Sequence, residues 1–297
     1  MTLAPPAEAT LAAVAAFGLA GSRHPLPAAP LADDEWEGLV ATCVDAGLVG
    51  LLAAAADAGA LPLRDGQGEE LRGSAAQASD RSLAVERAAA AHSARLATAG
   101  IDHRVLDGPA LVPRVFRTPE RRPVVSVDVL VAPGAVGSAH ALADGDADLV
   151  RVRDEALPAG VGARVRLADM ADPPVEVVVP GPEGGGTCLP GLPLDAVCVS
   201  ACARAAAGPQ ELIALRDVAQ IALVEPLECA LVWARADAWR CTGVVAWAVA
   251  QAWQTFDLAD KTELSVWASR YQPTPRGPRR VSALAQRLAQ AIYRDEL

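Results

Sequence analysis

The sequence has a single lysine, Lys261, so that 25 of its 26 basic residues are arginine. Aromatic residues make up only 4% of a chain that is 52% hydrophobic, so alanine, valine and leucine must build most of the core. The arginine bias and the abundant alanine are typical of GC-rich coding and indicate a bacterial source. With 297 residues of this composition, the chain is long enough for a full core and too apolar for intrinsic disorder.

Positive charge is also scarce relative to negative charge: 26 Lys and Arg residues stand against 36 Asp and Glu residues, which gives a formal net charge of −10 at pH 7. A general nucleic-acid binder needs a basic face that neutralises phosphates, so this balance argues against that class of protein. A local exception is a basic tail, which we interpret as a solvated helix end: Arg276, Arg279, Arg280 and Arg287.

Targeting and membrane signals are missing as well. The n-region of a signal peptide carries positive charge, but no Lys or Arg precedes the short apolar run 10–20. The Ala- and Leu-rich stretch 38–60 carries Asp45 and Asp57, which disfavours a membrane span. These absences predict a cytoplasmic protein without a membrane partner.

The cysteines form no CxxC pair. Cys198 and Cys202 are four residues apart in a predicted helix, but no His or second Cys pair completes a zinc-ligand set. The sequence therefore predicts small buried thiols in a reducing compartment at all six positions: Cys43, Cys188, Cys198, Cys202, Cys229 and Cys241.

Hydrophobic periodicity predicts helices at both ends of the chain and strands between them. Apolar residues recur at helical spacing through residues 8–100, and Gly100 is a good terminator for a helix over 78–99. The helical pattern returns over 193–256. Between these regions lie short Val-rich runs that predict strands, at 103–106, 124–131, 148–153, 162–167 and 175–179.

This order predicts an α+β fold, with a small mixed sheet flanked by helical regions. The Gly-rich loop 180–187 marks the expected end of the sheet, and the Pro-rich segment 271–280 precedes a predicted last helix over 281–295. The expected divisions are an N-terminal helical region 1–100, an α/β core 101–187, a C-terminal helical region 188–270, and a linker with a terminal helix 271–297.

Gly108 is a first candidate site residue, because it follows a predicted strand and precedes a predicted short helix, 109–117. A glycine at such a junction allows close approach to a phosphate at a helix N-terminus. A simple turn explains the same residue, and the sequence does not separate these two interpretations.

Two acids interrupt Val-rich runs. Ser126 and Asp128 alternate with Val125, Val127 and Val129, so the two polar side chains are expected on one face and the valines on the other. Glu176 lies within the run VEVVV. A buried unpaired carboxylate is costly, so two of them on neighbouring strands suggest a shared metal ion; a solvent-facing side of the sheet is the alternative.

The segment RPVVSVDVLV (122–131) resembles the R-P-x-x-D-h-D-h-L-V signature of a bacterial uncharacterised nucleotidyltransferase family, a branch of the polymerase-beta-like nucleotidyltransferase superfamily. VLDGPAL (105–111) is similar to the L-K-G-x-x-L motif of that family. LVEPLECALVWARADAW (223–239), after the pair Arg216-Asp217, is similar to its C-terminal helices. The resemblance covers about residues 31–256.

The resemblance implies a nucleotidyl-transfer fold, in which acids of a D-x-D strand and a third acid hold two Mg²⁺ (or Mn²⁺) ions that align an NTP with an acceptor hydroxyl. It implies Asp128 and Glu176 as catalytic metal ligands. It further implies that nucleotide contacts come from Gly108, Ser126, Arg122 and Asp107. Arg122 has three interpretations: it braces Asp128, reaches a phosphate, or forms an edge ion pair.

Two positions depart from the family pattern. Ser126 replaces the first Asp of D-x-D, and Asp107 replaces the usual Lys of L-K-G. Both changes disfavour a Mg²⁺–NTP complex, so we expect a degenerate member that is weakly active or inactive and that binds a nucleotide or a protein partner encoded nearby. The alternative is a working enzyme that moves NMP to a small-molecule or peptide hydroxyl, with Asp107 supplying the missing carboxylate.

Overall fold

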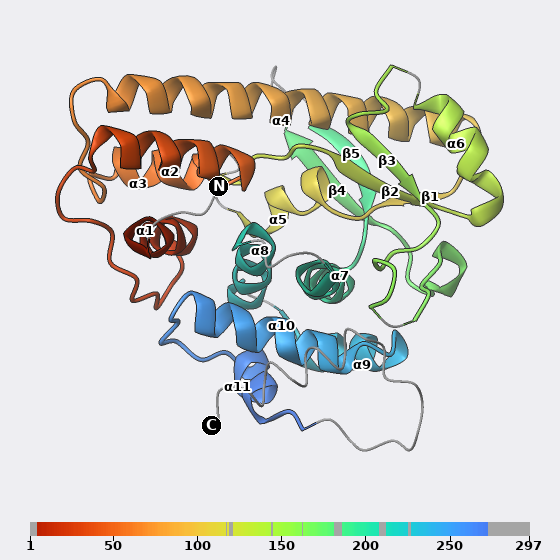
Figure 1. Ribbon diagram of the computed structural model, residues 1–297. Coiled ribbons are helices and arrows are strands. Elements are labelled where there is room, and N and C mark those ends of the chain that lie inside the picture. The colour runs from red at the N-terminus through yellow and green to blue at the C-terminus, as the bar shows by residue number, and fades with distance from the viewer. Residues whose placement is uncertain are drawn as a thin grey trace.

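The computed structural model confirms an α+β architecture in which a small mixed sheet is flanked by helices (Figure 1). The structure describes residues 5–116, 118, 121–143, 145–161, 163–180, 186–207, 212–224 and 227–272. The predicted last helix, 281–295, lies outside these residues. Within them, no helix combines the length and the apolar character that crossing a membrane requires.

The N-terminal region consists of α1 (Pro5–Ala16), α2 (Asp33–Asp45), α3 (Val49–Asp57) and the 32-residue α4 (Gln67–Thr98). Helix α4 runs along one side of the molecule and packs on both α3 and the sheet (Figure 1). It ends as the sequence predicts, because Gly100 takes a φ of 68° just after the last turn.

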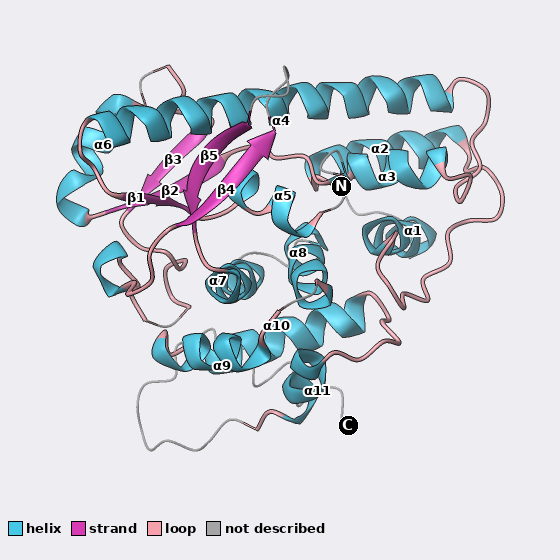
Figure 2. Cartoon of the chain, turned by 180° about the vertical axis from the view of Figure 1, so that it is seen from behind, coloured by secondary structure: helices cyan, strands magenta, loops and turns pink. Residues whose placement is uncertain are grey.

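Five strands form one sheet in the order β3-β2-β1-β5-β4, visible in magenta in Figure 2. Their bounds are β1 (His103–Val105), β2 (Val127–Val131), β3 (Val150–Arg153), β4 (Val175–Pro180) and β5 (Gly186–Gly191). The β2–β3 and β1–β5 pairs are parallel, whereas β1–β2 and β4–β5 are antiparallel. Short helical elements connect the strands: η1 (Gly108–Ala110), α5 (Val112–Val115), η3 (Pro133–Ala135), α6 (Val136–Leu142) and η4 (Leu167–Asp169).

Two of the strand predictions were wrong. The described residues of the run 162–167 form no strand, and the sheet does not end at the Gly-rich loop, because β5 follows it. The expected boundary after residue 187 therefore falls inside β5. This strand pairs with both β1 and β4 and so occupies an interior position in the sheet.

The C-terminal helices α7 (Leu194–Ala207), α8 (Leu212–Leu223), α9 (Cys229–Ala238), α10 (Thr242–Thr255) and α11 (Glu263–Arg270) pack beyond the sheet on the side away from α4 (Figures 1 and 2). Their Ala-rich faces share one continuous hydrophobic core with the sheet and the N-terminal helices, which extends from Val14 to Ala268.

The two ends of the folded region meet through their backbones. Ser22 forms an isolated antiparallel bridge with Leu258, and the amide of Ala259 donates to the carbonyl of Gly21 over 2.8 Å. The His24 ring adds a 2.8 Å contact between Nε2 and the Thr255 carbonyl. These contacts join the loop after α1 to the end of α10.

Candidate functional site

Asp128 is a buried acid in the second position of β2, where all five residues are buried. Its side chain is only 6% exposed, and each of its oxygens faces an arginine. Arg151 Nε donates to Oδ1 over 2.7 Å, and Arg153 Nε lies 2.7 Å from Oδ2. The two guanidinium groups thus compensate the charge that burial would otherwise make costly.

Strand register explains this arrangement. Asp128 is the partner of Arg151 in the parallel β2–β3 ladder, and Arg153 lies two residues further on the same face of β3. Arg104 shares that face, since it pairs with Leu130, the partner of Arg153. The Arg104 guanidinium binds Asp102 over 2.6 Å.

The opposite face of β1 packs on α4. His103 contacts Ser93 of α4 through Nε2 at 2.7 Å, and its Nδ1 lies 3.1 Å from the carbonyl of Ile101. Burial lowers the pKa of His103, which favours the neutral ring. This histidine is therefore a packed strand residue and lies on the other side of the sheet from Asp128.

Asp107 lies beside Asp128, at the end of β1. Its Oδ1 accepts the backbone N–H of Asp128 over 3.1 Å, and its Oδ2 is 3.9 Å from Arg204 of α7. Burial raises the pKa of Asp107, Arg204 acts in the opposite direction, and the nearby Asp128 carboxylate raises it further. Asp107 and Asp128 are thus brought together, as the compensating-carboxylate alternative requires.

Gly108 has a packing role. Its φ is 53°, and a Cβ at this position would lie 2.8 Å from Val124 Cγ1 and 3.3 Å from the Ser126 carbonyl oxygen. The space that a side chain would take is therefore filled by the segment before β2. The helical elements that follow are only three and four residues long, so no extended helix N-terminus faces this turn.

Ser126 and Glu176 do not join Asp128 in the way expected. Strand β2 begins at Val127, one residue after Ser126, and Val125 is 55% exposed, so the expectation that it packs opposite was wrong. Glu176 is exposed on β4, and β1 and β5 separate β4 from β2. At ~4.8 Å per strand, this separation is about 14 Å, so the expected placement of the two acids on neighbouring strands was wrong.

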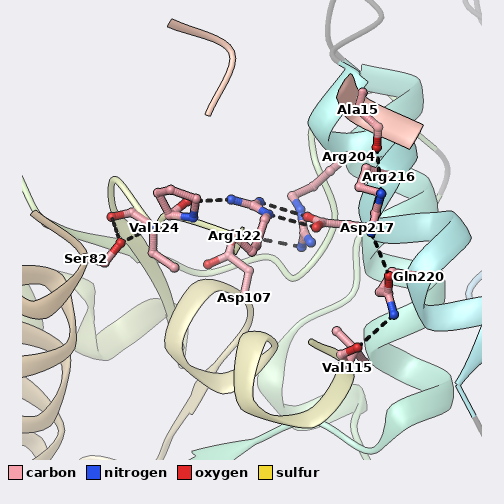
Figure 3. Close-up of polar contacts among 11 residues, drawn as sticks. Ala15, Ser82, Asp107, Val115, Arg122, Val124, Arg204, Arg216, Asp217 and Gln220 are labelled. Carbon is pink, nitrogen blue, oxygen red and sulfur yellow. Dashed lines mark hydrogen bonds and ion pairs between the residues drawn. The ribbon is translucent and has the colours of Figure 1, made fainter. Parts of the chain in front are cut away.

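Arg122 holds the segment before β2 against helix α8. Its Nε and Nη2 donate to the two oxygens of Asp217 over 2.8 and 2.9 Å, and Nη1 donates to the Pro123 carbonyl (Figure 3). On the other side, the Ser82 hydroxyl of α4 accepts the Val124 N–H over 2.7 Å. Of the three interpretations of Arg122, the ion pair fits these contacts. It is a buried pair and not one at an edge, because the side chain of Asp217 is only 3% exposed.

Arg216, the neighbour of Asp217, points the other way. Its Nη1 donates to the carbonyls of Ala15 and Phe17 over 2.7 and 2.8 Å, and its Nη2 to Gln220, which in turn binds the Val115 carbonyl (Figure 3). Burial lowers the pKa of Arg216 to about 10. Arg216 and Asp217, although adjacent in sequence, thus bind two different regions of the chain.

These residues do not fit a pair of divalent metal ions. Mg²⁺ prefers several oxygen ligands, whereas both oxygens of Asp128 face arginines and Glu176 is distant. Within the described parts of the chain, no group of three or more His, Cys, Asp or Glu side chains is placed to hold a metal ion. Five of the six cysteines are buried, as predicted, but the prediction was wrong for Cys188, which is exposed.

Sequence reasoning missed the three arginines that surround the two acids: Arg151, Arg153 and Arg204. A signal for two of them was present in the run VRVR over 150–153, because alternation in a strand places both arginines on one face. Which residue of β2 the two arginines contact depends on the register between β2 and β3, and the sequence does not reveal that register.

Compared with protein-family models, with curated proteins and with solved structures, the chain gives no match. The resemblance to nucleotidyltransferases therefore stays an expectation from the motifs of this sequence.

Proposed function

We propose that this protein is a nucleotidyltransferase-like pseudoenzyme, which binds a nucleotide or a protein partner and does not perform metal-dependent transfer. One observation carries the proposal: both carboxylate oxygens of Asp128, the surviving acid of the D-x-D motif, face arginine nitrogens at 2.7 Å. In a working site of this class, those oxygens would bind the metal ions.

Electrostatics supports the same conclusion. A metal ion at Asp128 would have to displace Arg151 and Arg153 and would then lie beside two guanidinium groups. Like charges at a distance of a few ångströms repel strongly where water is partly excluded. Ser126 adds no anionic oxygen to offset this repulsion. The changed D-x-D position and the arginines therefore both disfavour metal binding.

The alternative is an active enzyme in which Asp107 replaces the missing carboxylate. One contact favours it, the 3.1 Å hydrogen bond that places Asp107 Oδ1 beside the Asp128 backbone. In that case, the arginines would have to swing away when Mg²⁺ and an NTP bind.

Calorimetry with each of the four NTPs, in Mg²⁺ or Mn²⁺, tests the proposal. A parallel assay follows transfer of labelled NMP. The variants are Asp128→Ala and Ser126→Asp, with Asp33→Ala as a control that removes an exposed carboxylate in the N-terminal region.

We expect no metal-dependent nucleotide binding in the wild type and no transfer product. The proposal also expects Asp128→Ala to leave both results unchanged. Metal-dependent binding or transfer that Asp128→Ala abolishes, while Asp33→Ala retains it, would overturn the proposal and support the Asp107 alternative. Recovery of metal binding in Ser126→Asp alone would identify that serine as the disabling change.

A further inference from the structure

The face of β3 that points away from α4 carries two arginines, Arg151 and Arg153, whose terminal amino groups have no hydrogen-bond partner among the described residues. Arg151 and Arg153 contact Asp128 through Nε, and no described residue accepts a hydrogen bond from their terminal amino groups. Their side chains are 54% and 42% exposed, although the acid between them is buried. One buried carboxylate therefore holds two exposed guanidinium groups side by side.

The cluster formed by Asp107, Asp128 and the arginines that contact them carries a net positive charge. Arg151, Arg153 and Arg204 together carry three positive charges, against two negative charges on Asp107 and Asp128. The surplus is one positive charge, in a chain whose formal net charge is −10. On the same face, Arg104 is neutralised by Asp102 and leaves this surplus unchanged.

The geometry points to a metal-independent binding site for a phosphate group of a small molecule, formed by Arg151 and Arg153 and oriented by Asp128. The inference deepens the proposed function and rests on it, because it requires that Asp128 serve the arginines and not a metal ion. Asp128 is a positioning residue here, since it acts through the two guanidinium groups.

Phosphate chemistry matches this pair better than a carboxylate does. A phosphate monoester carries a charge of about −1.5 to −2 at neutral pH and three acceptor oxygens, so it can accept hydrogen bonds from both guanidinium groups. A carboxylate has only two acceptor oxygens and a single negative charge, so it offers the two guanidinium groups fewer acceptors and less charge. Because Nε is already used by Asp128, the terminal amino groups of each arginine are the donors that remain for the ligand.

Calorimetry on the full chain in EDTA tests the site, with inorganic phosphate, pyrophosphate and ATP as probes and acetate as the comparison anion. Pyrophosphate and ATP distinguish a bare phosphate site from one that also recognises a nucleoside. The variants are Arg151→Gln and Arg153→Gln. Each leaves Asp128 with one arginine, so the buried acid stays paired, and thermal unfolding checks that the variants fold.

We expect phosphate-bearing probes to bind in EDTA, acetate to bind at least tenfold more weakly, and each arginine variant to lose at least tenfold in affinity. Arg151→Lys keeps the charge but not the planar fork, so its affinity should fall between wild type and Arg151→Gln. Arg64→Gln removes an exposed arginine that pairs with Asp33 and should bind as the wild type does.

No binding of any phosphate probe in EDTA would overturn this inference, as would equal affinity in wild type and Arg151→Gln. Either result leaves the proposed function standing if metal-dependent transfer is also absent. Binding that appears only with Mg²⁺ and is lost in Asp128→Ala would overturn both.

Discussion

Gly108 shows how a single residue can resemble a ligand-binding feature while serving the packing of the chain. Its position after β1 matches a phosphate-binding turn, but the nearest atoms around it belong to Val124 and Ser126. The positive φ of 53° and this close approach together explain why glycine stands here.

Gly108→Ala should therefore destabilise the fold. The strained φ and the contact with Val124 at 2.8 Å predict a loss of about 1–3 kcal/mol in the free energy of unfolding, measured by urea denaturation. Gly137→Ala is the matched control, because a Cβ added to this exposed glycine of α6 would meet no described atom of another element within 4 Å. The control should be neutral or slightly stabilising, and an equal loss in both variants would contradict the packing role.

Asp107 provides a pH-dependent prediction. Because its pKa is raised in the folded state, the proton stabilises the fold at low pH, and this contribution is lost as the pH rises through the folded pKa. Asp107→Asn keeps an oxygen for the Asp128 N–H and carries no charge. The variant should be at least as stable as wild type at pH 7, and its advantage should shrink as the pH falls toward 4.

Thermal unfolding at several pH values measures this difference, with Asp33→Asn at an exposed carboxylate as the control for surface charge. If Asp107→Asn has a lower Tm than the wild type at pH 7, and if the Tm difference between the two does not change with pH, the contact between Asp107 and Arg204 outweighs the cost of burying the charge.

At the scale of elements, helix α8 connects parts of the chain that are distant in sequence. Asp217 binds Arg122 before β2, while Arg216 binds the carbonyls at the end of α1. Two successive residues thus fix one helix against the sheet region and against the N-terminal helices (Figure 3).

Breaking the Arg122–Asp217 pair from either side should cost about 3–5 kcal/mol of unfolding free energy, because a two-point ion pair between two largely buried side chains is lost. Chemical denaturation of Arg122→Gln, Asp217→Asn and the double variant forms a double-mutant cycle. The double variant should lose less than the sum of the single losses. The exposed Arg64–Asp33 pair offers a matched cycle, with an expected coupling of about 0–1 kcal/mol. A similarly small coupling for Arg122–Asp217 would refute its structural importance.

The sequence predicts elements with strong local signals and misses those that depend on distant partners. Helix α4 and strand β2 have clear periodicity, and both were predicted with shifted ends. Strand β5, by contrast, has the sequence GTCLPG, whose glycines and proline have low strand propensity; it is a strand because β1 and β4 pair with it. Likewise, Asp128 stood out as a lone acid in an apolar run, but its two arginines depended on register.

At the scale of the whole molecule, the first three of the four regions expected from the sequence share one core. Buried residues from Val14 to Ala268 belong to a single cluster, and the loop at 21–24 is bound to residues 255–259 near the other end of the described chain. The helical regions and the sheet therefore stabilise one another.

The backbone bridge between Ser22 and Leu258 has a consequence for synthesis of the chain on the ribosome. The first helices emerge early, but the residues that complete their packing are made more than 200 positions later. At about 5–20 residues per second, this delay lasts from ~10 seconds to under a minute. During that interval, the apolar faces of the N-terminal helices lack their final partners, so a nascent chain exposes hydrophobic surface that the finished fold covers.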